Sequence, residues 1–227
     1  MPPIVRTLLC LLPMLVASIA ATAAESLAGT RLSMLQPPAP AYQTQDTASP
    51  WADLDPGRLD LRSASALVVD AEGRELFSRN ADQVAPIASI TKLMTAMVVL
   101  DAEVDMEQII TISRQDRDLH KLTGSRLRYG EASLSRRELL LIALLASENA
   151  AAAALGRTTF PGGSAEFVRA MNRKAVELGM EDSRFVDPTG LYAENRASPR
   201  DLLKLTQAAY EYPLIRQAST TRSLEVR

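Results

Sequence analysis

Residues 86–101 read Pro86-Ile87-Ala88-Ser89-Ile90-Thr91-Lys92-Leu93-Met94-Thr95-Ala96-Met97-Val98-Val99-Leu100-Asp101. Apolar residues recur here at the i, i+3, i+4 spacing of a core-facing helix, and Pro86 suits the first helical turn. Ser89 and Lys92 are three residues apart, which places their β-carbons about 5–6 Å apart on one helix face. A hydroxyl and an amine would then lie within proton-transfer distance near a helix N-terminus, where free N–H groups stabilise an oxyanion. The predicted core-facing stripe consists of Leu93, Met94, Met97, Val98 and Leu100.

A Ser-x-x-Lys pair is weak evidence when it stands alone. A chain of this length contains about one such pair by chance. The alternative interpretation is a serine that caps a helix, followed by a solvated lysine. A partner motif elsewhere in the chain is therefore needed before Ser89 and Lys92 can be assigned to chemistry.

The overall composition limits the function classes. The chain has 227 residues, a formal net charge of −2, 47% apolar residues and 23% charged residues. These values predict one globular domain able to build a core, and they do not favour a nucleic-acid partner. The chain has one cysteine, Cys10, and one histidine, His120. His120 stands in a charged stretch typical of an exposed loop, so a serine enzyme here is predicted to use lysine as its base.

The N-terminal segment predicts export. Arg6 precedes an apolar run over residues 7–20, and the small residues 21–24 follow, with an Ala-x-Ala pattern that predicts cleavage after Ala23. Residues 1–23 are therefore interpreted as a signal peptide and the mature protein as periplasmic; an uncleaved membrane anchor is the alternative. Because Cys10 falls in the removed segment, a thiol nucleophile, a disulfide and a cysteine metal site are excluded.

The chain after the signal segment divides into a linker and a folded part. Residues 24–62 are rich in Pro, Ala and Gln, which predicts a flexible linker. Residues 63–227 are predicted to form the catalytic domain. Short β-branched or apolar runs over residues 65–70 and 75–79 predict a hairpin turned at Asp70-Ala71-Glu72-Gly73, and residues 108–113 predict another extended segment.

Several helices follow in the predicted domain. Ser135-Arg136-Arg137-Glu138 is a capping box before a continuously apolar helix over 139–146, which we expect to be buried on all sides. An alanine-rich helix over 150–155 is expected to stop at Gly156. A further helix over 165–178 is expected to be capped by Ser164, and another to open at Ser198-Pro199.

Ser147-Glu148-Asn149 closes the buried helix and is the partner motif that Ser89 and Lys92 need. Polar residues that end a buried helix are delivered to the interior, where they need partners or have a function. A second Ser-x-Asn occurs at Ser78-Arg79-Asn80, but it lies at the end of a predicted strand. Capping and turn formation remain the alternative for Ser147 and Asn149.

At this point the chain resembles the penicillin-recognising serine acyltransferases, which are the penicillin-binding proteins and serine β-lactamases. Residues 86–102, 185–191 and 212–215 are similar to one branch, the low-molecular-mass D-alanyl-D-alanine endopeptidases, and the resemblance runs from about Ser63 to Arg222. It implies an α+β transpeptidase fold, with an antiparallel sheet and a helical subdomain. The implied partners are peptidoglycan stem peptides and β-lactam antibiotics. No metal, organic cofactor or oligomeric state is implied.

The resemblance also implies roles for the four site residues. Ser89 would be the nucleophile that forms an acyl-enzyme, and Lys92 would accept its proton. Ser147 would relay a proton to the departing amine, and Asn149 would bind the substrate's peptide amide. An amine with a reference pKa near 10.4 must be largely neutral to act as a base, so we expect its pKa to be lowered by burial or by a neighbouring cation.

One part of the family pattern is not found in this sequence. The family carries a Lys-Thr-Gly motif on a later strand that donates the second oxyanion N–H, and the only lysine after Pro188 is Lys204, in a helical context. We therefore expect the C-terminal strands to be missing and only the first hairpin of the sheet to be present. We also expect impaired activity if the cell makes only this chain, because loss of one oxyanion donor costs about 10²–10³ in rate.

Several functions remain open from the sequence. The first is a D-alanyl-D-alanine endopeptidase that cleaves peptidoglycan cross-links, and the second is a D-alanyl-D-alanine carboxypeptidase. A β-lactamase is disfavoured because no Glu-x-x-Leu-Asn segment is present, and Glu166 is followed by Phe167-Val168-Arg169. An inactive peptidoglycan-binding envelope protein is the alternative from another functional class. The Asp187-Pro188-Thr189-Gly190 segment is predicted to be a tight turn, and the resemblance implies that it helps to shape the cleft floor; turn formation alone is the alternative.

Overall fold

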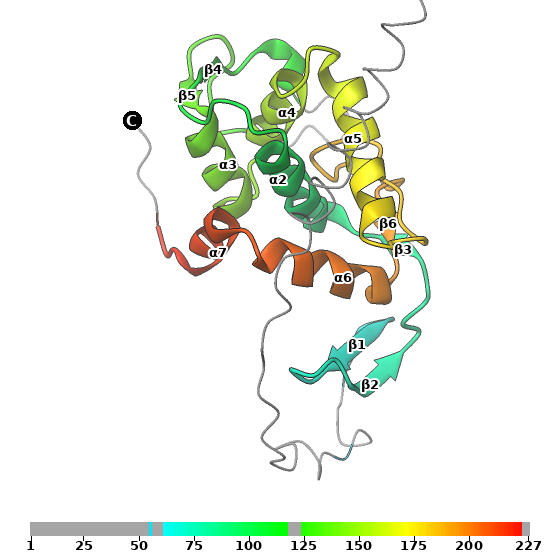
Figure 1. Ribbon diagram of the computed structural model, residues 1–227. Helices are drawn as coiled ribbons and strands as arrows, with labels where there is room; N and C mark the ends of the chain where they lie inside the picture. Colours follow the sequence, from blue (N-terminus) through cyan, green and yellow to red (C-terminus); the bar gives the residue numbers. More distant parts are fainter. Residues whose placement is uncertain (1–54, 56–60, 118–123, 224–227) are drawn as a thin grey trace, which may run out of the picture. The chain divides into compact units, whose positions relative to one another are not determined.

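Helix α2 (Thr91–Asp101) lies at the centre of the described residues (Figure 1). The computed structural model describes residues 55, 61–117 and 124–223, all within one unit, Trp51–Arg227. The predicted signal peptide 1–23, almost all of the predicted linker 24–62, and His120 lie outside the described residues. Among the described residues, no helix combines the length and the apolar character needed to cross a bilayer.

Helix α2 is buried on nearly every side. It packs against α3 (Arg136–Leu145), α4 (Asn149–Thr158), α5 (Gly163–Glu177) and α6 (Pro199–Tyr210). The predicted single apolar stripe was too narrow, because positions between its members are buried as well. A helix that packs against four others has little surface in contact with solvent, so its small and polar residues also pack inside. The buried residues of α2 are Thr91, Lys92, Met94, Thr95, Ala96, Met97, Val98 and Val99.

Helix α3 begins as predicted. The Ser135 hydroxyl accepts from the Glu138 N–H at 3.2 Å, and the Glu138 carboxylate accepts from the Ser135 N–H at 2.8 Å. This reciprocal pair satisfies two N–H groups that a helix start leaves without partners. The expectation that residues 139–146 are buried on all sides was too broad, because Ile142, Leu144 and Leu145 are only partly buried and Ala146 is exposed.

Two predicted helix boundaries were wrong. Gly156 does not end a helix, because α4 continues to Thr158. A β-carbon at Gly156 would lie 2.7 Å from Pro188 Cγ, so glycine here permits close packing of α4 on residue 188. Ser164 lies inside α5 and is not its cap. The Gly162 N–H instead donates to the Glu166 carboxylate at 2.8 Å.

The predicted hairpin is confirmed. Strands β1 (Ala66–Val69) and β2 (Glu75–Arg79) pair antiparallel, with Val68 opposite Phe77. The buried Asp70 carboxylate accepts from the backbone N–H groups of Glu72 at 3.0 Å and Arg74 at 2.8 Å. These contacts fix the turn, as short aspartate side chains do at turns.

Two further strand pairs form separate two-stranded sheets outside this hairpin. Strand β4 (Ile109–Thr111), in the predicted extended segment, pairs with β5 (Ser133–Ser135). Strand β3 (Ala85–Pro86) pairs with β6 (Arg196–Ala197). Pro86 therefore ends a strand and does not begin a helix.

Short helices complete the described part of the chain. The 3-10 turn η2 (Ala88–Ile90) directly precedes α2, and the 3-10 turn η3 (Arg114–Asp116) follows β4. Helix α6 begins as predicted, with Pro199 in the first position and the Ser198 hydroxyl accepting from the Asp201 N–H at 3.3 Å. Helix α7 (Pro213–Thr220) follows it and packs against α3 and α6.

Candidate active site

The candidate nucleophile lies in η2, directly before α2. Ser89 is exposed, whereas Lys92, in the first turn of α2, is only 3% exposed. The Lys92 Nζ donates to Ser89 Oγ at 3.1 Å. The predicted contact between an accessible hydroxyl and a buried amine is therefore present.

The connection between α3 and α4 brings the other two predicted residues to the same place. The Ser147 hydroxyl donates to Ser89 Oγ at 2.8 Å, across a separation of 58 residues. Asn149 Oδ1 accepts from Lys92 Nζ at 2.8 Å. Ser147 is exposed and has a φ of +53°, so the expectation that the end of α3 would deliver it to the interior was wrong. The left-handed backbone there turns the chain outward between the two helices.

The second Ser-x-Asn segment has a different environment. The Asn80 side-chain amide donates to the carbonyl oxygen of Ala64 at 2.8 Å, next to the hairpin. Ser147-Glu148-Asn149 is therefore the copy that meets Ser89 and Lys92.

Lys92 has a partner for each of its three N–H donors. These partners are Ser89 Oγ, Asn149 Oδ1 and the backbone oxygen of Thr189, the last at 2.8 Å. A neutral lysine amine has two N–H groups and one lone pair. If the two N–H groups stay on Asn149 and Thr189, the lone pair points at Ser89. This arrangement orients the amine to remove the proton of the nucleophile.

Burial makes the neutral form of Lys92 accessible. Desolvation lowers the pKa of Lys92 from 10.5 to about 8, while the negative charges of Asp187 and Glu148 oppose this change. A base with a pKa near 8 is partly neutral close to neutral pH. The pKa of Lys92 is thus lowered as expected, and the cause is burial rather than a neighbouring cation.

Sequence reasoning missed the backbone contribution of residues 187–190. The chain bends over residues 188–190 at the predicted position, and the Asp187 side chain holds this turn. The direct contact of the Thr189 carbonyl oxygen with Lys92 was not predicted. A β-carbon on Gly190 would lie 1.9 Å from the Ala88 carbonyl oxygen. Gly190, whose φ is +83°, therefore lets the turn pack directly on the residue before Ser89. The glycine itself was the available signal, because it marks a position of close backbone approach.

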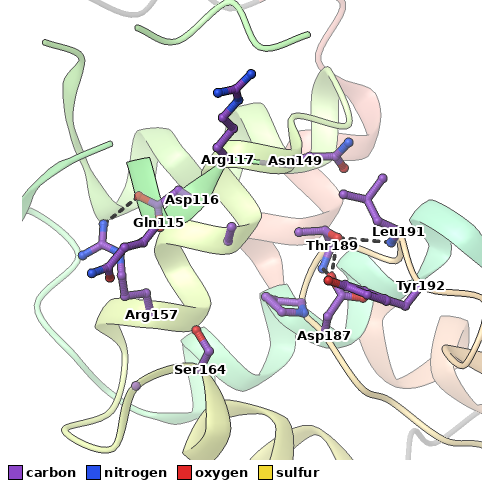
Figure 2. A pocket seen from close by; sticks show the side chains of 13 residues that line it. Gln115, Asp116, Arg117, Asn149, Arg157, Ser164, Asp187, Thr189, Leu191 and Tyr192 are labelled. Atoms are coloured by element: carbon purple, nitrogen blue, oxygen red, sulfur yellow. Dashed lines mark hydrogen bonds and ion pairs between the residues drawn. The ribbon is translucent and has the colours of Figure 1, made fainter. Parts of the chain in front are cut away.

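A pocket of about 500 Å³ lies beside this cluster and includes Asn149 and Thr189 in its lining. Figure 2 shows Asp187, Thr189 and Tyr192 on one side of the pocket and the Asp116–Arg157 ion pair on the opposite side. The two side chains of that pair are 2.7 Å apart at their closest nitrogen and oxygen atoms. The Asp116 side chain is almost fully buried, so the pair fixes η3 against α4 at the edge of the pocket.

The described residues contain no cluster of three or more metal-ligating side chains. The groups that meet at this place are the hydroxyls of Ser89 and Ser147, the amine of Lys92 and the oxygens of Asn149 and Thr189. Such a set supports nucleophilic attack by Ser89 on a carbonyl carbon, with Lys92 as the proton acceptor.

Comparison with known proteins gives a consistent family match. The family model described as D-alanyl-D-alanine carboxypeptidase matches residues 51–227. A D-alanyl-D-alanine endopeptidase from Pseudomonas aeruginosa is 49% identical over 167 residues, which are 73% of this chain and 53% of that protein. A D-alanyl-D-alanine endopeptidase from Escherichia coli is 43% identical over 182 residues, which are 80% of this chain and 58% of that protein. The chain thus spans a little over half the length of these curated relatives.

Solved structures show the same fold. Penicillin-binding protein D2 from Listeria monocytogenes in its cefotaxime-bound form has a TM-score of 0.65 and 30% identity, with coverage of 73% of this chain and 69% of that chain. Its ampicillin-bound form has a TM-score of 0.63 and 31% sequence identity, and the match covers 74% of this chain and 70% of that chain. The expected α+β fold of the penicillin-binding proteins is therefore confirmed.

Proposed function

This chain belongs to the D-alanyl-D-alanine carboxypeptidase family, and we propose on that basis that it is a serine D,D-peptidase acting on peptidoglycan through an acyl-enzyme. The observation that carries the proposal is the position of Ser89 Oγ, which accepts from both Lys92 Nζ at 3.1 Å and Ser147 Oγ at 2.8 Å. One hydroxyl between an amine and a second hydroxyl has both a proton acceptor and a path for the proton.

Each side chain then has a defined step. Ser89 Oγ attacks the carbonyl carbon of a D-alanyl peptide bond while Lys92 takes the serine proton. The carbon–nitrogen bond breaks, and Ser147 passes the proton to the departing amine. Water then attacks the resulting ester and releases Ser89. Asn149 holds Lys92 before the substrate binds, and its side-chain amide is suited to bind the peptide amide of the substrate.

The proposed reaction is cleavage of cross-links by an endopeptidase. Support comes from the Pseudomonas aeruginosa and Escherichia coli relatives, both named D-alanyl-D-alanine endopeptidases, at 49% and 43% identity. A carboxypeptidase is the second candidate, because the family model has that description and a Bacillus subtilis relative with that name is 30% identical. Both reactions use the same nucleophile, so they differ in the substrate that the cleft admits.

We further propose that β-lactams acylate Ser89 and that the protein works in the periplasm. The Listeria monocytogenes neighbours are described as cefotaxime-bound and ampicillin-bound forms, which supports a β-lactam site in the shared fold. The charged, apolar and small-residue order of residues 1–24 supports export. Peptidoglycan lies in that compartment, so the location and the proposed substrate agree.

The test is the intact mass of the protein as its own cells make it, measured with and without penicillin. We expect a gain of one penicillin mass in the wild type and no gain in Ser89→Ala. Because Ser89 is exposed, its truncation is not expected to unfold the protein. A wild-type protein that never gains the adduct, or a Ser89→Ala variant that still gains it, contradicts the proposal.

A further inference from the structure

Asp187 has no part in the reaction steps given above, yet its carboxylate lies within the turn that binds Lys92. We propose that Asp187 is a positioning residue whose carboxylate shapes this turn and so holds Lys92 in contact with Ser89. The inference rests on the proposed function of Lys92 as the proton acceptor. It concerns how the base is held and charged, not the identity of the nucleophile.

The first observation is the number of donors that meet this carboxylate. Asp187 Oδ2 accepts from the Thr189 N–H at 2.8 Å and from the Thr189 hydroxyl. Asp187 Oδ1 accepts from the Gly190 N–H at 3.3 Å and from the side-chain amide of Asn195. Figure 2 shows Asp187 and Thr189 joined in this way at the pocket wall. All four donors belong to residues 189–195, so the shape of the turn depends on one carboxylate.

The second observation ties the same turn to the segment that carries the nucleophile. Asn195 is fully buried, and its Oδ1 accepts from the backbone N–H groups of Val186 at 2.9 Å and Asp187 at 3.3 Å. Its backbone oxygen accepts from the Ile87 N–H at 3.0 Å. Asn195 therefore connects Asp187 to the residue that precedes η2.

The third observation is what the turn presents to the site. The Thr189 carbonyl oxygen lies 2.8 Å from Lys92 Nζ, and Gly190 packs directly on the Ala88 carbonyl. A shift of the turn by about 1 Å would lengthen the first contact and alter the second. Effects of this size matter because misplacement by about 1 Å can cost 100-fold in rate.

The charge of Asp187 acts on Lys92 as well. Burial lowers the pKa of Lys92 to about 8, and the two charged groups that oppose this change are Asp187 and Glu148. The atoms in direct contact with the amine, on Ser89, Asn149 and Thr189, are uncharged oxygens. Removing the Asp187 charge leaves Glu148 as the remaining carboxylate that favours the ammonium, so the pKa should fall further.

The experiment compares three variants with the wild-type protein as its own cells make it. Asp187→Asn keeps the size of the side chain, removes its charge and leaves one accepting oxygen, so the two donors on the other oxygen lose their acceptor. Asp187→Ala removes all four hydrogen bonds. Asp182→Asn is the matched control, because its side chain is exposed and lies on the same segment. The titration of Lys92 is followed by NMR in protein labelled with ¹³C-lysine, and the Lys92→Arg variant identifies its signal. The rate of acylation by penicillin is measured over the same pH range, and circular dichroism checks that each variant is folded.

We expect Lys92 in Asp187→Asn to titrate below its wild-type value of about 8, and the acid limb of the acylation profile to move to lower pH with it. We expect Asp187→Ala to acylate about 10- to 100-fold more slowly at its best pH, and Asp182→Asn to match the wild type. An Asp187→Ala variant that acylates as fast as the wild type, or a Lys92 titration in Asp187→Asn equal to that of the wild type, overturns the inference. If wild-type Ser89 forms no adduct, the proposed function fails, and the NMR titration still decides the role of Asp187.

Discussion

Lys92 is an unfavourable residue to bury, and the cost depends on pH. The pKa of Lys92 is about 8 in the folded protein and 10.5 in the ordinary, solvated state. Between these values the unfolded chain holds a proton that the folded protein has released. The free energy of unfolding therefore rises with pH through this window. Below pH 8 both states are protonated, and the whole penalty of the buried ammonium is present.

Lys92→Met tests this penalty because methionine has a similar length and no charge. Relative to the variant, the wild type should gain on the order of 2–3 kcal/mol of unfolding free energy between pH 8 and 10.5. The measurement is urea unfolding at several pH values. Lys174→Met is the control. Burial acts to lower the pKa of Lys174, but hydrogen bonds to Asp101 and Tyr212 outweigh burial and raise that pKa. The difference between wild type and Lys174→Met should therefore show no gain in unfolding free energy over this pH range. If the difference in unfolding free energy between wild type and Lys92→Met does not change with pH, the buried environment assigned to Lys92 is contradicted.

The turn 187–190 and the η2 segment fit together through their backbones. A β-carbon at Gly190 would meet the Ala88 carbonyl oxygen at 1.9 Å, whereas one at Gly73 would have nothing within 4 Å. Both glycines have nearly the same φ, +83° and +82°. Alanine at either position therefore has a similar backbone cost of about 1–2 kcal/mol. The difference between the two substitutions isolates the effect of close packing.

Gly73→Ala and Gly190→Ala should thus differ sharply. We expect Gly73→Ala to lower the free energy of unfolding by about 1–2 kcal/mol and to leave acylation unchanged. Gly190→Ala should cost more than about 3 kcal/mol, and its folded fraction should acylate poorly, because Ala88 must move to relieve the clash. Urea unfolding and the penicillin adduct measure the two effects. If both variants lose the same amount of unfolding free energy, the turn can move away from Ala88 at no cost in stability, and the expectation is wrong.

Short sequence motifs correctly predicted the elements whose hydrogen bonds join residues close together in the chain. The capping box at Ser135 and the Asp70 turn each involve partners within four residues, and both are present. Pro86 and Gly156 were assigned wrongly because their partners are remote. Pro86 pairs with Arg196, and Gly156 packs on Pro188. A proline or glycine shows that the backbone is special at its position, but it does not show which distant segment requires this.

The same reasoning explains what was predicted of the candidate site. Ser89, Lys92, Ser147 and Asn149 were identified because side-chain chemistry and spacing are visible in a sequence, and the family resemblance joined the two motifs. The fifth participant is the Thr189 carbonyl oxygen, 97 residues from Lys92. Every residue has a backbone oxygen, so no residue type marks this contact. The meeting of these four side chains was therefore predictable, whereas the backbone contact that holds Lys92 was not.

The choice between the two peptidase reactions depends on substrates larger than the cluster around Ser89. An endopeptidase must admit a peptide strand on each side of the bond that it breaks, whereas a carboxypeptidase needs room for only one terminal D-alanine on the leaving side. The pocket of about 500 Å³ reaches from Asn149 to Tyr192 and offers space for peptide beside the candidate base. The expectation that the protein cleaves the larger substrate rests on the Pseudomonas aeruginosa and Escherichia coli relatives, which are named endopeptidases.

Purified cross-linked muropeptide dimers and free pentapeptides separate the two reactions directly. We expect the protein as its own cells make it to convert dimers to monomers faster than it trims pentapeptides, and Ser89→Ala to abolish both reactions. Chromatography of the products with time gives both rates in one experiment. Trimming of pentapeptides without any loss of dimers would identify a carboxypeptidase that uses the same serine. Loss of dimers that persists in Ser89→Ala would point to a contaminating enzyme, because the hydroxyl of Ser89 is the group on which the proposed acyl-enzyme forms.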